Sequence, residues 1–217
     1  NVRSLAGRPA IAYTIDAALE SGVFGRVVVS TDSESIAEIA RRCGAEVPFL
    51  RPPSLADDRT PVSAATVDAL ERVDAKHTTA AVCQLMANCP LRTSDDVRAS
   101  HAAFAAGDAP SQLSVTRYGW LNPWWAMRLG PHRELEPVFP DRAQQRSQDL
   151  PEVFCITGAI WWASADVLRR ERTYHVAGRS GWELPWQRAV DIDSEDDWLM
   201  AEVLLARALD PVRGDDG

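Results

Sequence analysis

The sequence lacks the features that would place the chain in a membrane or in an oxidising compartment. No run of about 18 apolar residues and no signal peptide occurs, so we expect a cytoplasmic protein without a membrane partner. The four cysteines are widely spaced and form no CxxC pair, which argues against a zinc site and against a disulfide framework. The chain has 217 residues, 46% of them hydrophobic, which is enough to bury the core of one domain.

Positive charge is also scarce. Lysine and arginine together number 23 against 31 acidic residues, which gives a net charge of −8 at pH 7. Surfaces that bind nucleic acid carry a local excess of basic residues, so we expect no nucleic-acid partner. A small anionic substrate remains compatible with this charge, because a few arginines, backbone N–H groups and a divalent cation can hold it.

Nucleophilic hydrolysis is disfavoured by what the sequence lacks. The four histidines have no partners at the spacing of a metal site or a catalytic triad, and no Ser/His/Asp order is visible. Tryptophan, by contrast, is abundant, and Trp120, Trp124 and Trp125 fall close together among eight tryptophans in all. For this group we weigh core packing, contact with a second subunit, and stacking on nucleic acid, which the negative charge disfavours.

Helix signals and apolar runs alternate along the first half of the chain. The expected helices cover residues 9–21, 33–43, 61–73 and 93–106, and the expected buried strands cover residues 26–32, 46–50 and 80–86. This alternation indicates an α/β fold with a largely parallel sheet and helices on both faces.

The second half departs from this alternation. Residues 113–118 and 124–129 are short apolar segments that suit an antiparallel excursion. Strand character then returns over residues 154–163, and a strand edge at residues 188–193 leads into a last helix over residues 194–209. We expect one domain over residues 1–210, followed by a disordered tail over residues 211–217.

Two carboxylates precede the last helix. If residues 190–193 are extended, Asp191 and Asp193 face the same side of the chain. Open α/β sheets bind ligands at the carboxyl ends of their strands, and Mg²⁺ takes one or two carboxylates together with phosphate oxygens. The alternative is that Asp193 or Ser194 caps the helix while Asp191 is solvated.

Other polar residues also follow expected strands. Arg51 precedes two prolines that hold it in a rigid loop, which suits a fixed contact to a base or phosphate but equally a surface ion pair. Arg92 again follows a strand end, and the segment of residues 146–149 could bind a carboxylate. Gly158 within a strand indicates either a bulge or the close approach of a backbone or ligand.

These segments, taken in order, resemble the acylneuraminate cytidylyltransferase family, which includes the CMP-sialic, CMP-legionaminic and CMP-pseudaminic acid synthetases. The matching stretches are NVRSLAGRPAIAYTI, VVVSTDSESIAEIA, GAEVPFLRPPSLADD, NCPLRTSDDV, RSQDLPEVF, TGAIWWA and AVDIDSEDDW. They cover nearly the entire chain, and several long motifs in register are far more specific than any one of them.

The resemblance implies a Rossmann-like nucleotidyltransferase fold of the nucleotide-diphospho-sugar transferase type. It implies a Mg²⁺-dependent reaction in which the anomeric hydroxyl of a nine-carbon α-keto sugar acid attacks the α-phosphate of CTP. Asp191 and Asp193 would be the catalytic metal ligands, and residues 113–138 would form the dimerisation insertion of a homodimer. The implied nucleotide contacts are Asn1 and Arg51, and the implied contacts near the sugar acid are Met86, Asn88, Arg92, Gln148, Thr157 and Gly158.

The sequence departs from the family pattern at its beginning. Family members open with a strand and a Gly/Ser/Lys/Arg-rich phosphate loop ending in Lys-Asn, whereas this sequence opens at that asparagine, Asn1. We therefore expect that the sequence is a piece of a longer protein. The alternative is a catalytically silent, dimer-forming remnant that binds nucleotide.

Other departures concern the acceptor. Met86 stands where the family has a glutamine, and a thioether cannot donate a hydrogen bond to a sugar. Val62 replaces a serine found in many sialic acid enzymes. Residues 146–150 resemble the pseudaminic spelling, whereas residues 158–160 resemble the sialic and legionaminic one. The sequence leaves the nine-carbon acid open, and a nucleotidyltransferase for an octulosonate or a phosphonate is the alternative enzyme.

Overall fold

The computed structural model describes residues 2–57 and 59–209. Its α-helices are α1 (Ala10–Ser21), α2 (Glu34–Arg42), α3 (Val62–Val73), α4 (Ser94–Ala106), α5 (Ala165–Glu171) and α6 (Glu195–Leu209). Its central sheet contains β3 (Ala81–Gln84), β4 (Ser111–Arg117), β7 (Phe154–Ser164) and β8 (Ser180–Glu183). Short hairpins are formed by β1 (Ser4–Leu5) with β2 (Arg8–Pro9), and by β5 (Met127–Leu129) with β6 (Leu135–Pro137).

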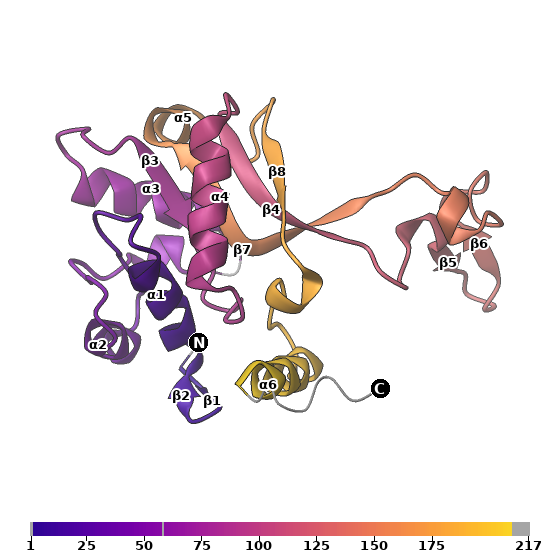
Figure 1. Ribbon diagram of the computed structural model, residues 1–217, viewed down its shortest axis with the longest axis horizontal. Coiled ribbons are helices and arrows are strands. Elements are labelled where there is room, and N and C mark those ends of the chain that lie inside the picture. The colour runs from indigo at the N-terminus through magenta and orange to yellow at the C-terminus, as the bar shows by residue number, and fades with distance from the viewer. Residues whose placement is uncertain (1, 58, 210–217) are drawn as a thin grey trace.

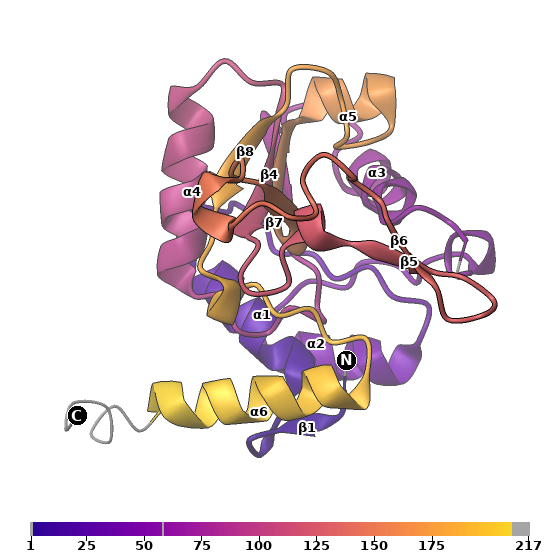
Figure 2. The ribbon, with the colours of Figure 1, turned by 90° about the vertical axis from the view of Figure 1, so that its right-hand side faces the viewer.

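The central sheet has helices on both faces, as expected for the α/β class. Its strand order is β3-β7-β4-β8, and α4 covers one face while α3 and α5 lie on the other (Figure 2). Three of its strands, β3, β4 and β8, run in the same direction, as expected of a largely parallel sheet, and β7 runs against them. Strand β4 is parallel to β8, but β7 is antiparallel to β3 and to β4. The reason is that the chain leaves the sheet along β4 and returns along β7, which sets these neighbours in opposite directions.

Local signals set the ends of several helices. The Ser33 hydroxyl accepts a hydrogen bond from the Ile36 N–H at the start of α2. Thr93 and Asp96 form a capping box at the start of α4, with the Thr93 Oγ1 and Asp96 N atoms 3.2 Å apart. Gly22 ends α1 in the left-handed region at φ 67°, a conformation that a glycine adopts without steric cost.

The two expected strands before β3 are present only as an isolated pairing. Val28 and Glu46 form a parallel bridge, in which the Val29 N–H donates to the Glu46 carbonyl at 2.9 Å. Backbone groups alternate in direction along an extended chain, so those of Val28 and Ser30 point away from this bridge. No backbone partner for them is found within residues 2–57 and 59–209. Pairing on one side only explains why neither segment forms a full strand.

A second strand expectation is also wrong. Residues 188–193 do not form a strand; instead a short 3₁₀ turn, η4 (Trp186–Arg188), precedes an irregular segment that leads to α6. Within residues 2–57 and 59–209, a single backbone hydrogen bond joins residues 190–193 to the turn that follows β3. In it, the Ile192 N–H donates to the Asn88 carbonyl. The expected tail at residues 211–217 lies outside the described residues.

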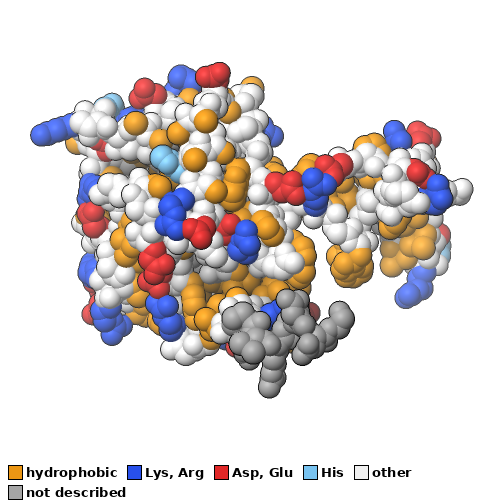
Figure 3. Space-filling view, viewed as in Figure 1, with side chains coloured by type: hydrophobic (Ala, Val, Ile, Leu, Met, Phe, Trp, Pro, Cys, Tyr) orange, Lys and Arg blue, Asp and Glu red, His pale blue; other side chains and the backbone are white. Residues whose placement is uncertain are grey.

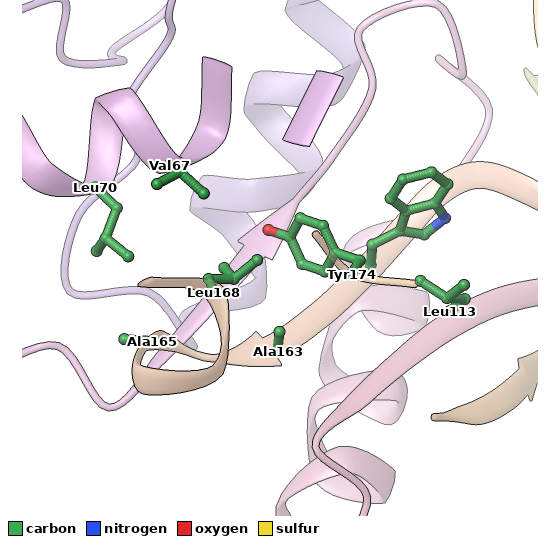
Figure 4. Close-up of a cluster of buried hydrophobic side chains, with 8 residues drawn as sticks. Val67, Leu70, Leu113, Ala163, Ala165, Leu168 and Tyr174 are labelled. Carbon is green, nitrogen blue, oxygen red and sulfur yellow. The ribbon is translucent and has the colours of Figure 1, made fainter. Parts of the chain in front are cut away.

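The main core lies between the sheet and the α3–α5 layer. Figure 4 shows Tyr174 and Leu113 on the sheet side, with Leu168 between them and the α3 residues Val67 and Leu70. All five side chains are buried. Trp161 and Ala163 of β7 belong to the same buried cluster, so the cluster packs both β4 and β7 against the helices.

An arm formed by residues 118–153 projects from the sheet (Figure 1). It begins after β4, which belongs to the central sheet, so its limits differ from the expected insertion of residues 113–138. Trp124 packs edge-on against Phe139 with ring centroids 5.0 Å apart, and its indole N–H donates to the Pro151 carbonyl at 2.8 Å. Of the three roles weighed for the tryptophans, packing therefore applies to Trp124.

The root of the arm is held by exposed charges. Arg117, the last residue of β4, forms ion pairs with Glu152 and Glu183. Its guanidinium also lies 5.4 Å from the ring centroid of Phe154, at the point where the chain returns to the sheet.

Over the described ranges, no helix is both long and apolar enough to traverse a lipid bilayer.

Candidate functional site

The turn that follows β3 contacts the segment of residues 190–193, which lies about a hundred residues further along the chain. The Asn88 carbonyl accepts a hydrogen bond from the Ile192 N–H at 2.9 Å. The Asn88 side-chain amide donates to the Asp193 Oδ1 atom at 3.3 Å. Asn88 therefore fixes both the backbone between the two aspartates and the carboxylate of Asp193.

The start of α6 shows which of the two residues named in the alternative interpretation, Asp193 or Ser194, caps the helix. The Ser194 hydroxyl accepts from the Asp197 N–H at 3.3 Å, and the Asp197 carboxylate accepts from the Ser194 N–H at 2.8 Å. Ser194 is thus the residue that caps the helix. The side chain of Asp193 is not used for capping and is directed to Asn88 instead.

Asp191 lies in a less polar environment than Asp193. Burial raises the pKa of the Asp191 carboxyl, and the negative charge of Asp193 adds to this increase. The Cys89 thiol and the positive charge of Arg92 act in the opposite direction. The two aspartates are two residues apart in a segment that is not a strand.

The residues present fit a divalent cation. The Asp191 Oδ1 atom is buried and has no hydrogen-bond partner among the described residues. A buried carboxylate oxygen without such a partner is available to coordinate a cation. In the same ranges no three His, Cys, Asp or Glu side chains form a metal cluster. Two carboxylates completed by phosphate oxygens are a donor set that suits Mg²⁺ better than zinc.

A cavity of about 740 Å³ opens beside these residues. Asn88 and Ile192 line it near the aspartates, and Asp32 and Arg51 line it from another side. The Arg51 guanidinium is mostly buried and lies 3.5 Å from the Asp32 carboxylate. Arg51 is thus positioned at the cavity, where its ion pair and a contact to an anionic ligand are both compatible with the geometry.

The side chain of Met86 also lines this cavity and packs on Gly158. The Met86 N–H donates to the Gly158 carbonyl at 3.3 Å, and a Cβ atom at position 158 would lie 2.3 Å from the Met86 sulfur. Gly158 also falls within the irregular stretch between β4 and β7. Both explanations of this glycine, a bulge and a close approach, therefore apply, and the approaching group is Met86.

Four predicted contacts with the sugar acid, namely Gly158, Arg92, Thr157 and Gln148, do not line this cavity. The Arg92 side chain is buried and donates to the Thr14 hydroxyl at 2.9 Å. The Thr157 hydroxyl shares a 2.7 Å hydrogen bond with that of Ser114. Gln148 is exposed on a 3₁₀ turn, η3 (Ser147–Asp149), in the arm. Their contacts with substrate stay predictions, and Asn1 lies outside the described residues.

Sequence reasoning missed two residues beside the site. Thr14 lies on α1 and binds Arg92, although its place in the helix gave no polar signal. Cys89 is fully buried next to Asp191 and Arg92. A buried cysteine is most often part of a core, so no sequence signal distinguished it.

A larger cavity of about 1180 Å³ lies elsewhere, between α1, the start of α4 and the second half of α6. Among the predicted site residues only Arg92 lines it. Size alone would select this cavity, but Asn88, which binds the Asp193 carboxylate, and Ile192, which lies between the two aspartates, line the smaller one. The chemistry therefore assigns the candidate site to the smaller cavity.

The fold places the chain in a class. A structure of CMP:2-keto-3-deoxy-manno-octonic acid synthetase complexed with CTP superposes with a TM-score of 0.68 at 13% identity, over 95% of this chain and 91% of that one. A structure of 4-diphosphocytidyl-2C-methyl-D-erythritol synthase from Anaerococcus prevotii gives 0.67 at 11% identity, over 94% of this chain and 92% of that one. The fold is that of the nucleotidyltransferases, which confirms the expected class.

Sequence comparison narrows the class to a family. The family model described as Cytidylyltransferase matches residues 1–113. A CMP-N,N'-diacetyllegionaminic acid synthase of Legionella pneumophila is 32% identical over 217 residues, which cover 94% of this chain and 88% of that protein. A pseudaminic acid cytidylyltransferase of Campylobacter jejuni is 28% identical over 205 residues, with the same coverage. The chain belongs to the cytidylyltransferase family.

Proposed function

We propose that this chain transfers CMP from CTP to a nine-carbon α-keto sugar acid and releases pyrophosphate. The named activities of the Legionella and Campylobacter relatives, each similar over 94% of this chain, support the acceptor class. The observation that carries the proposal is the pair of Asp191 and Asp193 beside a cavity, with a buried carboxylate oxygen left without a partner.

In this reaction the anomeric hydroxyl oxygen forms a bond to the α-phosphorus of CTP. The bond from that phosphorus to the β-phosphate oxygen breaks, pyrophosphate leaves, and the hydroxyl proton is lost. Mg²⁺ held by Asp191 and Asp193 would neutralise charge on the phosphates and lower the pKa of the attacking hydroxyl. Asn88 orients Asp193, and Arg51 supplies positive charge to the nucleotide at the cavity.

The substitution Asp193→Asn tests the proposal. It keeps the shape of the side chain but removes its charge, so we expect pyrophosphate release to fall by about 10²-fold or more. The matched control is Asp196→Asn, which makes the same change of charge at an exposed residue in the first turn of α6. Full turnover by the Asp193 variant, in a folded protein, would reject the metal role of this pair.

The acceptor is tested by measuring pyrophosphate release with CTP, ATP and UTP across a panel of acids. The panel contains pseudaminic, legionaminic and N-acetylneuraminic acids, an octulosonate and a phosphonate. Turnover with CTP and a nine-carbon acid supports the proposal, and turnover restricted to the other acceptors contradicts it. Tight binding of CTP and Mg²⁺ in calorimetry without any turnover would instead indicate a silent nucleotide-binding protein.

We also propose that residues 1–210 act as one domain and that the arm mediates a homodimer. The support for the dimer is the apolar surface of the arm, where Trp120 is 85% exposed and Leu121 and Leu135 are each 66% exposed. Figure 3 shows such side chains gathered on the arm. An exposed apolar surface of this kind is typical of a protein–protein contact.

A further inference from the structure

Arg92 is a buried arginine that lies behind the candidate site. The residue is only 3% exposed. Burial lowers the pKa of its guanidinium, which shows that the surroundings disfavour the charge. A charge in such a position is costly unless it is well hydrogen bonded, so its contacts indicate why it is there.

The contacts of Arg92 join a helix to the turn that follows β3. Its Nη1 atom donates to the Thr14 hydroxyl of α1 at 2.9 Å, and its Nη2 atom donates to the Met86 carbonyl. The same carbonyl accepts from the Cys89 N–H at 3.2 Å. Arg92 therefore holds closed the turn of residues 86–89.

That turn carries the residue that contacts the aspartates. Asn88 accepts from the Ile192 N–H at 2.9 Å through its carbonyl and donates to Asp193 through its side chain at 3.3 Å. A continuous set of hydrogen bonds thus leads from Thr14 through Arg92 and the turn to Asp193. Displacement of the turn would move both contacts of Asn88 together.

A second buried arginine provides a comparison. Arg169 is also mostly buried, but it forms an ion pair with Asp74 at 2.5 Å, on the α3–α5 side of the molecule. Within residues 2–57 and 59–209, Arg92 makes no ion pair within 4.0 Å, and its hydrogen-bond acceptors are neutral. Arg169 contacts a buried carboxylate directly, whereas Arg92 acts on Asp191 only through its charge and directs its hydrogen bonds to the Thr14 hydroxyl and to the turn.

We propose that Arg92 is a positioning residue, which fixes the turn of residues 86–89 so that Asn88 holds Asp193 in the orientation that binds the divalent cation. The proposal rests on the proposed function. It gives Arg92 an indirect role in place of the contact with the sugar acid that the family resemblance implies.

The test compares Arg92→Met, Arg92→Lys and the control Arg169→Gln. The first readout is the affinity for Mn²⁺, measured by electron paramagnetic resonance without acceptor. We expect Arg92→Met to weaken Mn²⁺ binding about tenfold, as is typical when a residue that supports a metal ligand is lost. Arg92→Lys, which keeps a donor for the Met86 carbonyl, should recover part of this loss, and Arg169→Gln should leave Mn²⁺ affinity unchanged.

The second readout separates positioning from direct contact. Arg92→Met should raise the Mg²⁺ concentration for half-maximal turnover about tenfold, with KM for the sugar acid within about threefold of the original. Combining it with Asn88→Ala should add little to the effect of Asn88→Ala alone, because both changes act through one contact.

The outcomes that overturn the inference are distinct from those that overturn the proposed function. If Arg92→Met and Arg92→Lys fold and keep their Mn²⁺ affinity but raise KM for the sugar acid, Arg92 contacts the sugar acid directly and the inference is wrong. Fully additive effects with Asn88→Ala would show separate roles. If the unsubstituted protein does not bind Mn²⁺, or if its Mn²⁺ affinity does not depend on Asp193, the proposed function is contradicted as well.

Discussion

The body of the molecule and the arm differ in the side chains that they bury. In the body, polar side chains such as Arg92, Thr157 and Ser114 are buried and hydrogen bonded to one another or to the backbone. In the arm, large apolar side chains such as Trp120 and Leu135 lie at the surface. The body thus buries polar atoms, some of which, such as the Asp191 Oδ1 atom, have no hydrogen-bond partner among the described residues, whereas the arm leaves large apolar side chains in water.

This difference separates two tasks. Buried, hydrogen-bonded polar groups hold a site in one geometry, since each unsatisfied group would cost free energy. Exposed apolar groups contribute little to the stability of a single chain but favour association. We therefore expect changes in the body to alter the free energy of unfolding, and changes in the arm to alter self-association.

Gly158→Ala gives the largest expected effect on stability. The new methyl group would lie within 2.3 Å of the Met86 sulfur and 3.3 Å of the Cys89 sulfur. Overpacking of this kind costs about 1–3 kcal/mol of the free energy of unfolding, to be measured by urea denaturation. The control in the arm is Gly119→Ala, where no atom lies within 4 Å of the new methyl group. Equal losses at both positions would contradict the comparison.

Thr93→Ala tests a smaller contribution of the body. The substitution removes the hydroxyl that accepts from the Asp96 N–H at the start of α4 and should cost about 1 kcal/mol. In the arm, Asn122→Ala removes the cap of a short 3₁₀ turn, η2 (Pro123–Trp125), where Asn122 accepts from the Trp124 N–H at 3.1 Å. Its cost in the same urea titration should be below about 0.5 kcal/mol. A larger cost for Asn122→Ala would mean that the arm is as tightly coupled as the body.

Trp120→Ala gives the smallest expected change in stability. The side chain is exposed in the single chain, so the free energy of unfolding should change by less than about 0.5 kcal/mol when measured on dilute protein. Self-association, measured by analytical ultracentrifugation, should weaken instead. Trp186→Ala, at an exposed tryptophan in the body, is the control and should leave association unchanged. Association that depends on Trp186 rather than Trp120 would contradict the proposed use of the arm.

The parts of the fold set by neighbouring residues could be predicted from the sequence. Gly22 ends α1, and Ser33 and Thr93 cap the helices that follow them, as their local patterns indicate. Strand β8 (Ser180–Glu183) escaped prediction because its four residues gain their order by pairing with β4. The directions of β7 and its neighbours likewise depend on where the chain turns, which no local pattern encodes.

The site could be predicted to a similar extent. Asp191 and Asp193 were found because two carboxylates before a helix form a local pattern. The hydrogen bond from Asn88 to Asp193 joins positions 105 residues apart, and the hydrogen bond from Arg92 to Thr14 joins positions 78 residues apart. Such contacts depend on the packing of α1 and β3 against the rest of the molecule, so the role of Arg92 required the structure.

The ion pairs of Arg117 at the root of the arm have a consequence for the assembly. They are exposed, and exposed charges are screened over about 8 Å at physiological ionic strength. Because exposed pairs of this kind contribute only about 0–1 kcal/mol each and weaken with salt, we expect the position of the arm relative to the body to be more sensitive to ionic strength than the buried core of the body is.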